Sequence, residues 1–156
     1  MKYRQLTKEQ LEALHNEFAT FLASQQIDVN EWNQIKKDKP HIAEEELALF
    51  SDLVWDDVLS KTKFIDHISE THINIFQCTS KEMIRIYVKA EKEDFSFLNE
   101  KDFNFFLQNP LNDEFDYFKA SKKYEKERNL EIFELIEMGA HITQGELFKK
   151  LMLLIH

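Results

Sequence analysis

Glycine is scarce in this chain of 156 residues: only Gly139 and Gly145 occur, both near its end. Glycine is needed where the backbone must take a positive φ or pass close to a ligand. A phosphate-binding P-loop, a dinucleotide-binding GxGxxG turn and the GxSxG turn of serine hydrolases therefore have no counterpart here. The sequence excludes these classes of enzyme and predicts no catalytic residues.

Cysteine and positive charge are also in short supply. The single cysteine, Cys78, excludes CxxC zinc sites, iron–sulfur ligation and an internal disulfide, and a lone thiol fits a reducing compartment. A formal net charge of −9 disfavours binding to nucleic acid and to anionic membrane surfaces. The N-terminus has no apolar signal core, and no apolar run reaches the roughly 18 residues that span a bilayer. We therefore expect a cytoplasmic protein without a membrane segment.

Aromatic residues, in contrast, are plentiful. Fourteen phenylalanines within a hydrophobic fraction of 43% can supply the core of one domain over residues 1–156, and they exclude a disordered chain. Thr7 and Gln10 form a capping box ahead of an apolar helical stripe. Asp28 repeats this capping pattern, and Pro40 ends the helix that it begins. In the N-terminal third we predict helices over residues 8–25, 28–39 and 42–60, the last with Ala43, Leu47, Phe50, Val54 and Val58 facing inward.

From residue 64 the hydrophobic period changes to two. Apolar residues alternate with other residues over 73–76 and 84–89, which is typical of half-buried strands. With residues 64–69 this predicts three strands joined by short hairpin turns, and residues 115–120 are a candidate fourth. Further helices are predicted from Asn99 to before Pro110, over 124–138, and from a capping box at residues 143–146 to residue 155. The predicted fold class is α+β: a helical N-terminal third, a small antiparallel sheet of three to four strands, and C-terminal helices.

Both ends of the chain resemble one protein family. The N-terminal half of that family is similar to the opening MKYRQLTKEQLEALHNEFATFLASQQIDVNEW and to the ALFSDLVWDDVL helix. Its C-terminal end is similar to the closing EIFELIEMGAHITQGELFKKL. The family comprises uncharacterised small cytoplasmic proteins from Bacteroidota and carries a domain-of-unknown-function label. The resemblance implies a cytoplasmic bacterial protein, and it implies neither an activity nor catalytic residues.

The densest acidic cluster surrounds an aromatic residue on the helix predicted over 42–60. Like charges four residues apart on a helix repel each other weakly. Such a cluster is either a solvated face or a surface for a basic partner, and one helix supplies too few oxygen ligands for a metal. The candidate binding residues are Asp52, Trp55, Asp56 and Asp57.

Two other groups of polar residues are also candidate sites. His67, His72 and Cys78 are zinc-type ligands, and a hairpin turn could bring the histidines together, but their spacing matches no known finger and a fourth ligand is missing. We therefore predict no metal and no cofactor, and the sequence leaves open whether these three residues converge. Cys78 on a strand favours a buried structural thiol over a nucleophile.

A basic island surrounds Tyr124 and offers either an anion or RNA site or an ordinary charged helix start. Its members are Lys119, Lys122, Lys123, Lys126 and Arg128.

The C-terminal helix is apolar on more than one face, and residues 103–107 show the same excess. The two segments either meet inside one monomer or contact a second copy of the chain. For a homodimer the predicted contacts are Phe148, Met152 and Ile155.

We predict a non-enzymatic protein–protein interaction or scaffold module. The alternative is an enzyme or nucleic-acid-associated protein whose site is not recognisable from sequence; an enzyme should show a pocket with converging titratable groups, and a binding module a flat or grooved patch.

Overall fold

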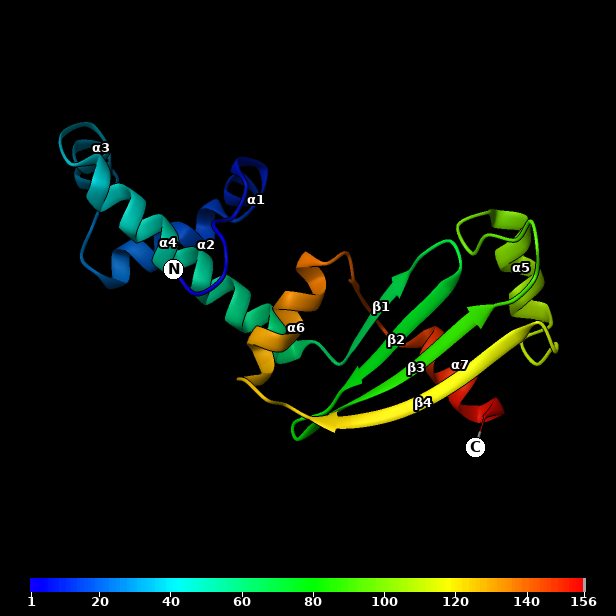
Figure 1. Ribbon diagram of the computed structural model, residues 1–156. Helices are drawn as coiled ribbons and strands as arrows, with labels where there is room; N and C mark the ends of the chain where they lie inside the picture. Colours follow the sequence, from blue (N-terminus) through cyan, green and yellow to red (C-terminus); the bar gives the residue numbers. More distant parts are fainter. Residues whose placement is uncertain (156) are drawn as a thin grey trace. The chain divides into compact units, whose positions relative to one another are not determined.

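The computed structural model describes residues 1–155, which divide into two compact units (Figure 1). The first unit is Met1–Ser60, and the second begins at Lys61. The first unit contains α1 (Lys8–Ala13), α2 (His15–Ser24), α3 (Val29–Asp38) and α4 (Pro40–Lys61), whose last residue begins the second unit. The division into two units does not test the prediction of a single domain over residues 1–156, which stays a prediction.

Local capping defines the helices of the first unit. The Thr7 hydroxyl accepts a hydrogen bond from the Gln10 amide at 3.2 Å and the Gln10 side chain accepts one from the Thr7 amide at 2.9 Å, which confirms the capping box. The Asp28 carboxylate caps α3 by accepting a hydrogen bond from the Glu31 amide at 2.8 Å. The prediction of one helix over 8–25 is wrong, because the chain bends at Leu14 (φ −105°, ψ 23°) and divides it into α1 and α2. Neither proline nor glycine marks this bend in the sequence.

Aromatic packing joins the helices of the first unit. The ring centroid of Phe18 lies 5.2 Å from that of Trp32 and 5.0 Å from that of Phe50, which connects α2 with α3 and α4. The buried residues of α4 are Ala43, Phe50, Ser51, Trp55 and Leu59. The buried stripe of α4 is therefore rotated from the predicted one at its C-terminal end, and Val58 is exposed.

The second unit contains a five-stranded antiparallel sheet. Its strands are β1 (Phe64–Ile68), β2 (His72–Cys78), β3 (Glu82–Ala90), β4 (Phe115–Lys123) and β5 (His141–Thr143), in the order β4-β3-β2-β1-β5. The α+β class with its antiparallel sheet is confirmed, whereas the count of three to four strands is wrong. Three residues of β5 are too few to show a period of two, and this strand exists because it pairs with β1.

One face of the sheet carries the core of the second unit. This face is covered by α5 (Glu100–Gln108) and α7 (Glu146–Leu154), and α7 lies behind the sheet in the view of Figure 1. Phe106 of α5 and Leu151 of α7 are fully buried there. The apolar surplus of residues 103–107 and of the C-terminal helix therefore meets within this unit. The predicted cap at residue 143 is wrong, because Thr143 lies in β5 and Gly145 (φ +79°) is the N-cap of α7.

The opposite face of the sheet, called the outer face below, meets α6 (Arg128–Glu137). This helix begins at Arg128 and not at the predicted residue 124, because a bend over residues 125–126 separates it from the end of β4. Strand register defines the outer face, because Phe76 stands opposite Ile65 and Arg85, and each of these pairs points to the same side. Asn74 and Tyr87 form the next pair on this face.

Candidate functional site

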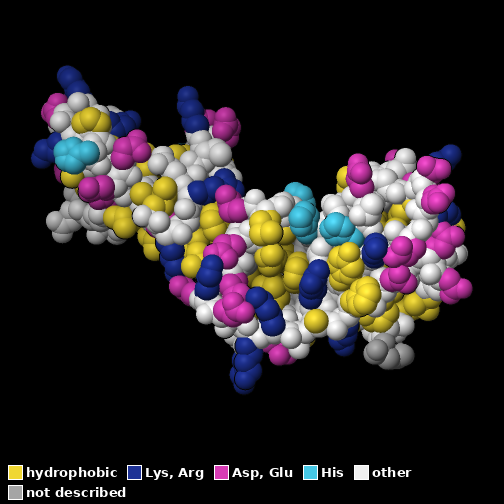
Figure 2. All heavy atoms as spheres, viewed as in Figure 1, with side chains coloured by type: hydrophobic (Ala, Val, Ile, Leu, Met, Phe, Trp, Pro, Cys, Tyr) yellow, Lys and Arg dark blue, Asp and Glu magenta, His cyan; other side chains and the backbone are white. Residues whose placement is uncertain are grey.

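A groove of about 500 Å³ lies on the outer face beside α6. Phe76, Arg85 and Ala120 are neighbours across β2, β3 and β4 and form its floor. The wall consists of Glu131, Glu134 and Leu135 of α6 and of Met138, the C-cap of that helix. Its other lining residues are His67, Asn74, Met83, Ser121 and Lys122. Figure 2 views the outer face and shows hydrophobic side chains exposed between charged ones over the sheet. We call this site the outer-face groove.

The unequal lengths of the elements create the groove. β3 and β4 are each nine residues long, and α6 lies near the end of the sheet that carries the β2–β3 turn. Cys78 and Met83 are buried at that end. Farther along the same face Phe118 remains 61% exposed. The period-two pattern thus places apolar and aromatic side chains, with Asn74 and Arg85 between them, on the part of the sheet that α6 leaves open.

Ion pairs neutralise the carboxylates of the wall. Lys122 Nζ lies 3.4 Å from Glu131 Oε1, and Lys126 Nζ lies 2.7 Å from Glu134 Oε1. Arg85, in the floor, has no carboxylate partner among residues 1–155. The groove therefore presents one unmatched positive charge.

Neighbouring side chains hold the Arg85 guanidinium in place. Its Nε donates a hydrogen bond to Asn74 Oδ1 at 2.7 Å, and its central carbon lies 5.1 Å from the centroid of the Tyr87 ring. The Tyr87 ring is 5.6 Å from His72 and 5.8 Å from Phe118, centroid to centroid. We call these three rings the aromatic row. It adjoins the groove and crosses β2, β3 and β4.

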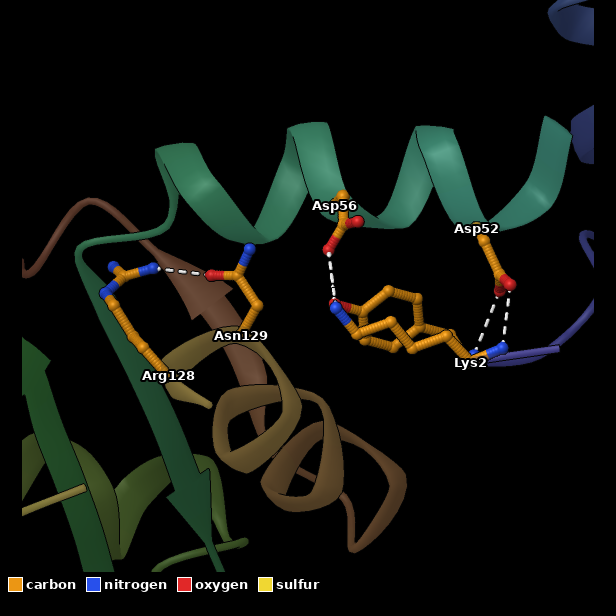
Figure 3. Close-up of polar contacts among 6 residues, drawn as sticks. Lys2, Asp52, Asp56, Arg128 and Asn129 are labelled. Carbon is orange, nitrogen blue, oxygen red and sulfur yellow. Dashed lines mark hydrogen bonds and ion pairs between the residues drawn. The ribbon is translucent and has the colours of Figure 1, made fainter. Parts of the chain in front are cut away.

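Arg128 fastens the beginning of α6 to the sheet. Its Nη2 donates hydrogen bonds to the carbonyl oxygens of Thr62 at 2.5 Å and Cys78 at 3.2 Å, and its Nε donates to that of Thr79 at 3.2 Å. Its Nη1 donates to Asn129 Oδ1 at 2.8 Å (Figure 3). These bonds join α6, the start of β1 and the β2–β3 turn, and so they position the wall of the groove.

The basic island is not one surface. Lys122 and Lys126 pair with glutamates, Arg128 binds backbone carbonyls, and the Tyr124 hydroxyl donates to Thr79 O at 2.8 Å. Lys119 and Lys123 alternate with Lys122 along β4 and belong to the other face of that strand. Most of the basic island therefore attaches α6 to the sheet, and its side chains do not gather into one anion-binding surface.

The structure does not bring His67, His72 and Cys78 together. His72 and Cys78 stand at opposite ends of β2, about 20 Å apart at the usual rise of a strand. Burial raises the pKa of the Cys78 thiol to about 11, although the nearby Arg128 charge lowers it, and Cys78 is the buried thiol that was predicted. No set of three or more His, Cys, Asp or Glu side chains in the described part of the chain is placed to hold a metal ion.

The acidic cluster of α4 holds the first residues of the chain. The Asp52 carboxylate accepts hydrogen bonds from the backbone amides of Lys2 at 2.7 Å and Tyr3 at 2.9 Å (Figure 3). The Tyr3 hydroxyl donates to Asp56, and the Arg4 guanidinium lies over the Trp55 ring at 4.9 Å. Asp57 is exposed on the same helix. Partner binding by Asp52, Trp55, Asp56 and Asp57 stays a prediction.

The predicted self-association residues belong to α7 and the residue that follows it. Phe148 is 2% exposed and packs against the Phe64 ring at 5.6 Å, within the core of the second unit. Met152 and Ile155 are half-buried against the same core. Self-association through these residues stays a prediction.

Comparison with known families gives a match that covers the whole chain. The model of a family of unknown function, DUF6495, matches residues 1–156. The chain belongs to this family. Neither a curated protein nor a solved structure matches it. The family match thus confirms the resemblance to a family of unknown function. Bacterial origin and cytoplasmic location stay predictions. None of the helices formed by residues 1–155 has the length and apolar character needed to cross a bilayer.

Sequence reasoning did not identify the outer-face groove of this DUF6495 protein. A usable signal was present, because Arg85 and Tyr87 alternate with apolar residues and so had to share one face of a strand. The alternation within β3 does not reveal the register between β2 and β3, and this register places Asn74 beside Arg85 and Tyr87.

Proposed function

We propose that this protein is a non-enzymatic interaction module that receives a segment of a partner protein in the outer-face groove. The observation that carries the proposal is the groove itself, an open channel of about 500 Å³ with apolar residues in its floor and wall. This volume lies within the range of binding pockets, and the groove is continued by the aromatic row, in which Phe118 is exposed and the other two rings are half-buried. Exposed apolar surface of this kind is typical of interaction sites.

The charges of the groove favour binding over catalysis. In a catalytic site, titratable side chains converge where a reacting atom can sit. Here Glu131 and Glu134 each form an ion pair with a lysine. The two pairs lie one after the other along α6 and do not converge on one point. Such pairs support a neutral wall against which another chain can pack.

The groove is a better candidate than the acidic face of α4. Asp52 and Asp56 already accept hydrogen bonds from residues 2 and 3, so a partner would have to displace the chain's own N-terminal segment. We also propose a cytoplasmic location, which the unpaired thiol of Cys78 supports because free thiols persist in reducing compartments.

Filling the groove tests the proposal. Ala120→Trp places an indole in its floor at an exposed position of β4, and Lys123→Trp places the same ring on the other face of that strand. Wild type and both variants, shown by circular dichroism to be folded, are used to capture partners from a lysate of the native host, with identification by mass spectrometry. We expect proteins that bind wild type and Lys123→Trp to be lost with Ala120→Trp. Equal capture by all three proteins would contradict the proposal.

A further inference from the structure

We infer that the partner segment is acidic: it binds the Arg85 guanidinium through one side-chain carboxylate and packs a neighbouring apolar side chain on the aromatic row. This inference rests on the proposed function of the groove. It adds the chemistry of the bound segment, which the presence of a groove alone does not specify.

The guanidinium of Arg85 is prepared for a carboxylate. Its Nε is occupied by Asn74, while its two terminal nitrogens have no hydrogen-bond acceptor among residues 1–155. Two terminal N–H groups of a guanidinium can donate parallel hydrogen bonds to both oxygens of one carboxylate. Because Asn74 and the Tyr87 ring already restrict the side chain, little conformational freedom is lost when a ligand binds.

The local charge selects a singly charged group. The two glutamates of the wall are matched by Lys122 and Lys126, so Arg85 leaves a surplus of one positive charge at the groove. Lys89, on the same strand face, pairs with Glu91 at 3.3 Å. One carboxylate balances this surplus. A nucleic-acid strand would bring several phosphates towards the wall glutamates, on a chain whose net charge is already −9.

The aromatic row adds the apolar half of the recognition. Arg85 and Tyr87 are two residues apart on β3, which is about 7 Å along a strand. Alternate side chains of an extended segment have the same spacing. An acidic residue over Arg85 therefore places the side chain two positions away over Tyr87 and the exposed Phe118 ring. The expected pattern in the partner is Asp or Glu, any residue, then an aromatic or large aliphatic residue, in either direction.

Selection from a displayed library of random twelve-residue peptides on the immobilised full chain tests this pattern. The enriched peptides should share the acid-x-apolar pattern. In fluorescence anisotropy, binding of the best peptide should weaken about tenfold or more with Arg85→Gln, because a charge-assisted contact is lost. Arg85→Lys keeps the charge without the fork and should give an intermediate affinity. Lys89→Gln removes the same charge elsewhere on β3 and should leave the affinity unchanged.

Several outcomes would overturn the inference. Enriched peptides without an acidic residue, or equal binding by wild type and a folded Arg85→Gln variant, exclude the carboxylate contact. Tighter binding of a twelve-nucleotide single-stranded RNA, lost with Phe118→Ala, would assign the surface to nucleic acid. If Ala120→Trp abolishes peptide binding and Arg85→Gln does not, only this inference fails. If no peptide is enriched, or if the enriched peptides bind Ala120→Trp as well as wild type, the proposed function fails with it.

Discussion

Replacing Arg128 with alanine should loosen the attachment of α6 to the sheet. The guanidinium donates hydrogen bonds to the carbonyl oxygens of Thr62, just before β1, and of Cys78 and Thr79, where β2 ends. A hydrogen bond to a charged group contributes about 1.5–3 kcal/mol to stability. Because the Arg128 side chain is half-buried, water can replace part of these contacts, and we expect a loss of about 2–4 kcal/mol in the free energy of unfolding.

Urea denaturation followed by circular dichroism measures this loss, and hydrogen–deuterium exchange locates it. Exchange should accelerate in α6 and at the β2–β3 turn. Arg128→Lys should give a smaller loss, since lysine keeps the charge but cannot reach the same carbonyls with a fork. Lys126→Ala, which removes an exposed cation from the same segment, is the control and should change stability little. A loss below about 1 kcal/mol with unchanged exchange in α6 would refute the role assigned to Arg128.

Two further predictions concern Gly145 and Tyr3. Gly145→Ala should destabilise the second unit by about 2–4 kcal/mol, because φ is +79° and the new Cβ would lie 2.5 Å from the Phe64 ring; equal urea midpoints for Gly145→Ala and wild type would contradict this. Burial, followed by the hydrogen bond to Asp56, raises the pKa of Tyr3 from 10.0 to about 12, so the folded chain keeps a proton that the unfolded chain releases. The free energy of unfolding of the first unit should therefore fall as the pH rises from about 10 to about 12, and Tyr3→Phe should flatten this slope. Urea unfolding can be followed by tryptophan fluorescence, since both tryptophans lie in the first unit, and an identical slope in the variant would exclude Tyr3 as its cause.

Short-range interactions explain the parts of the fold that could be predicted. The caps at Thr7, Asp28 and Asn99 each bind an amide three residues along the chain, so their signal lies within one helical turn. The alternation of apolar residues in β2 and β3 is equally local, and it predicted the antiparallel sheet. The strand β5 left no such signal, since pairing with β1 creates it, and neither proline nor glycine marks the bend at Leu14.

Distant pairs decided which polar residues form a site. In the sequence, Asp52 and Asp56 stand out as an acidic cluster, yet their partners Lys2 and Tyr3 lie about fifty positions away. Arg85 is one of twenty cations in the sequence, and only the register of β2 with β3 places Asn74 beside it.

The sequence by itself determined the character of each segment: which residues cap helices, which alternate in strands, and which chemistries the scarcity of glycine and cysteine excludes. Those properties depend on neighbours within a few positions. The tertiary structure decided the strand register, the attachment of α6 through Arg128 and the groove between that helix and the sheet. These depend on burying the apolar faces of distant segments together, and that burial is a property of the folded chain as a whole.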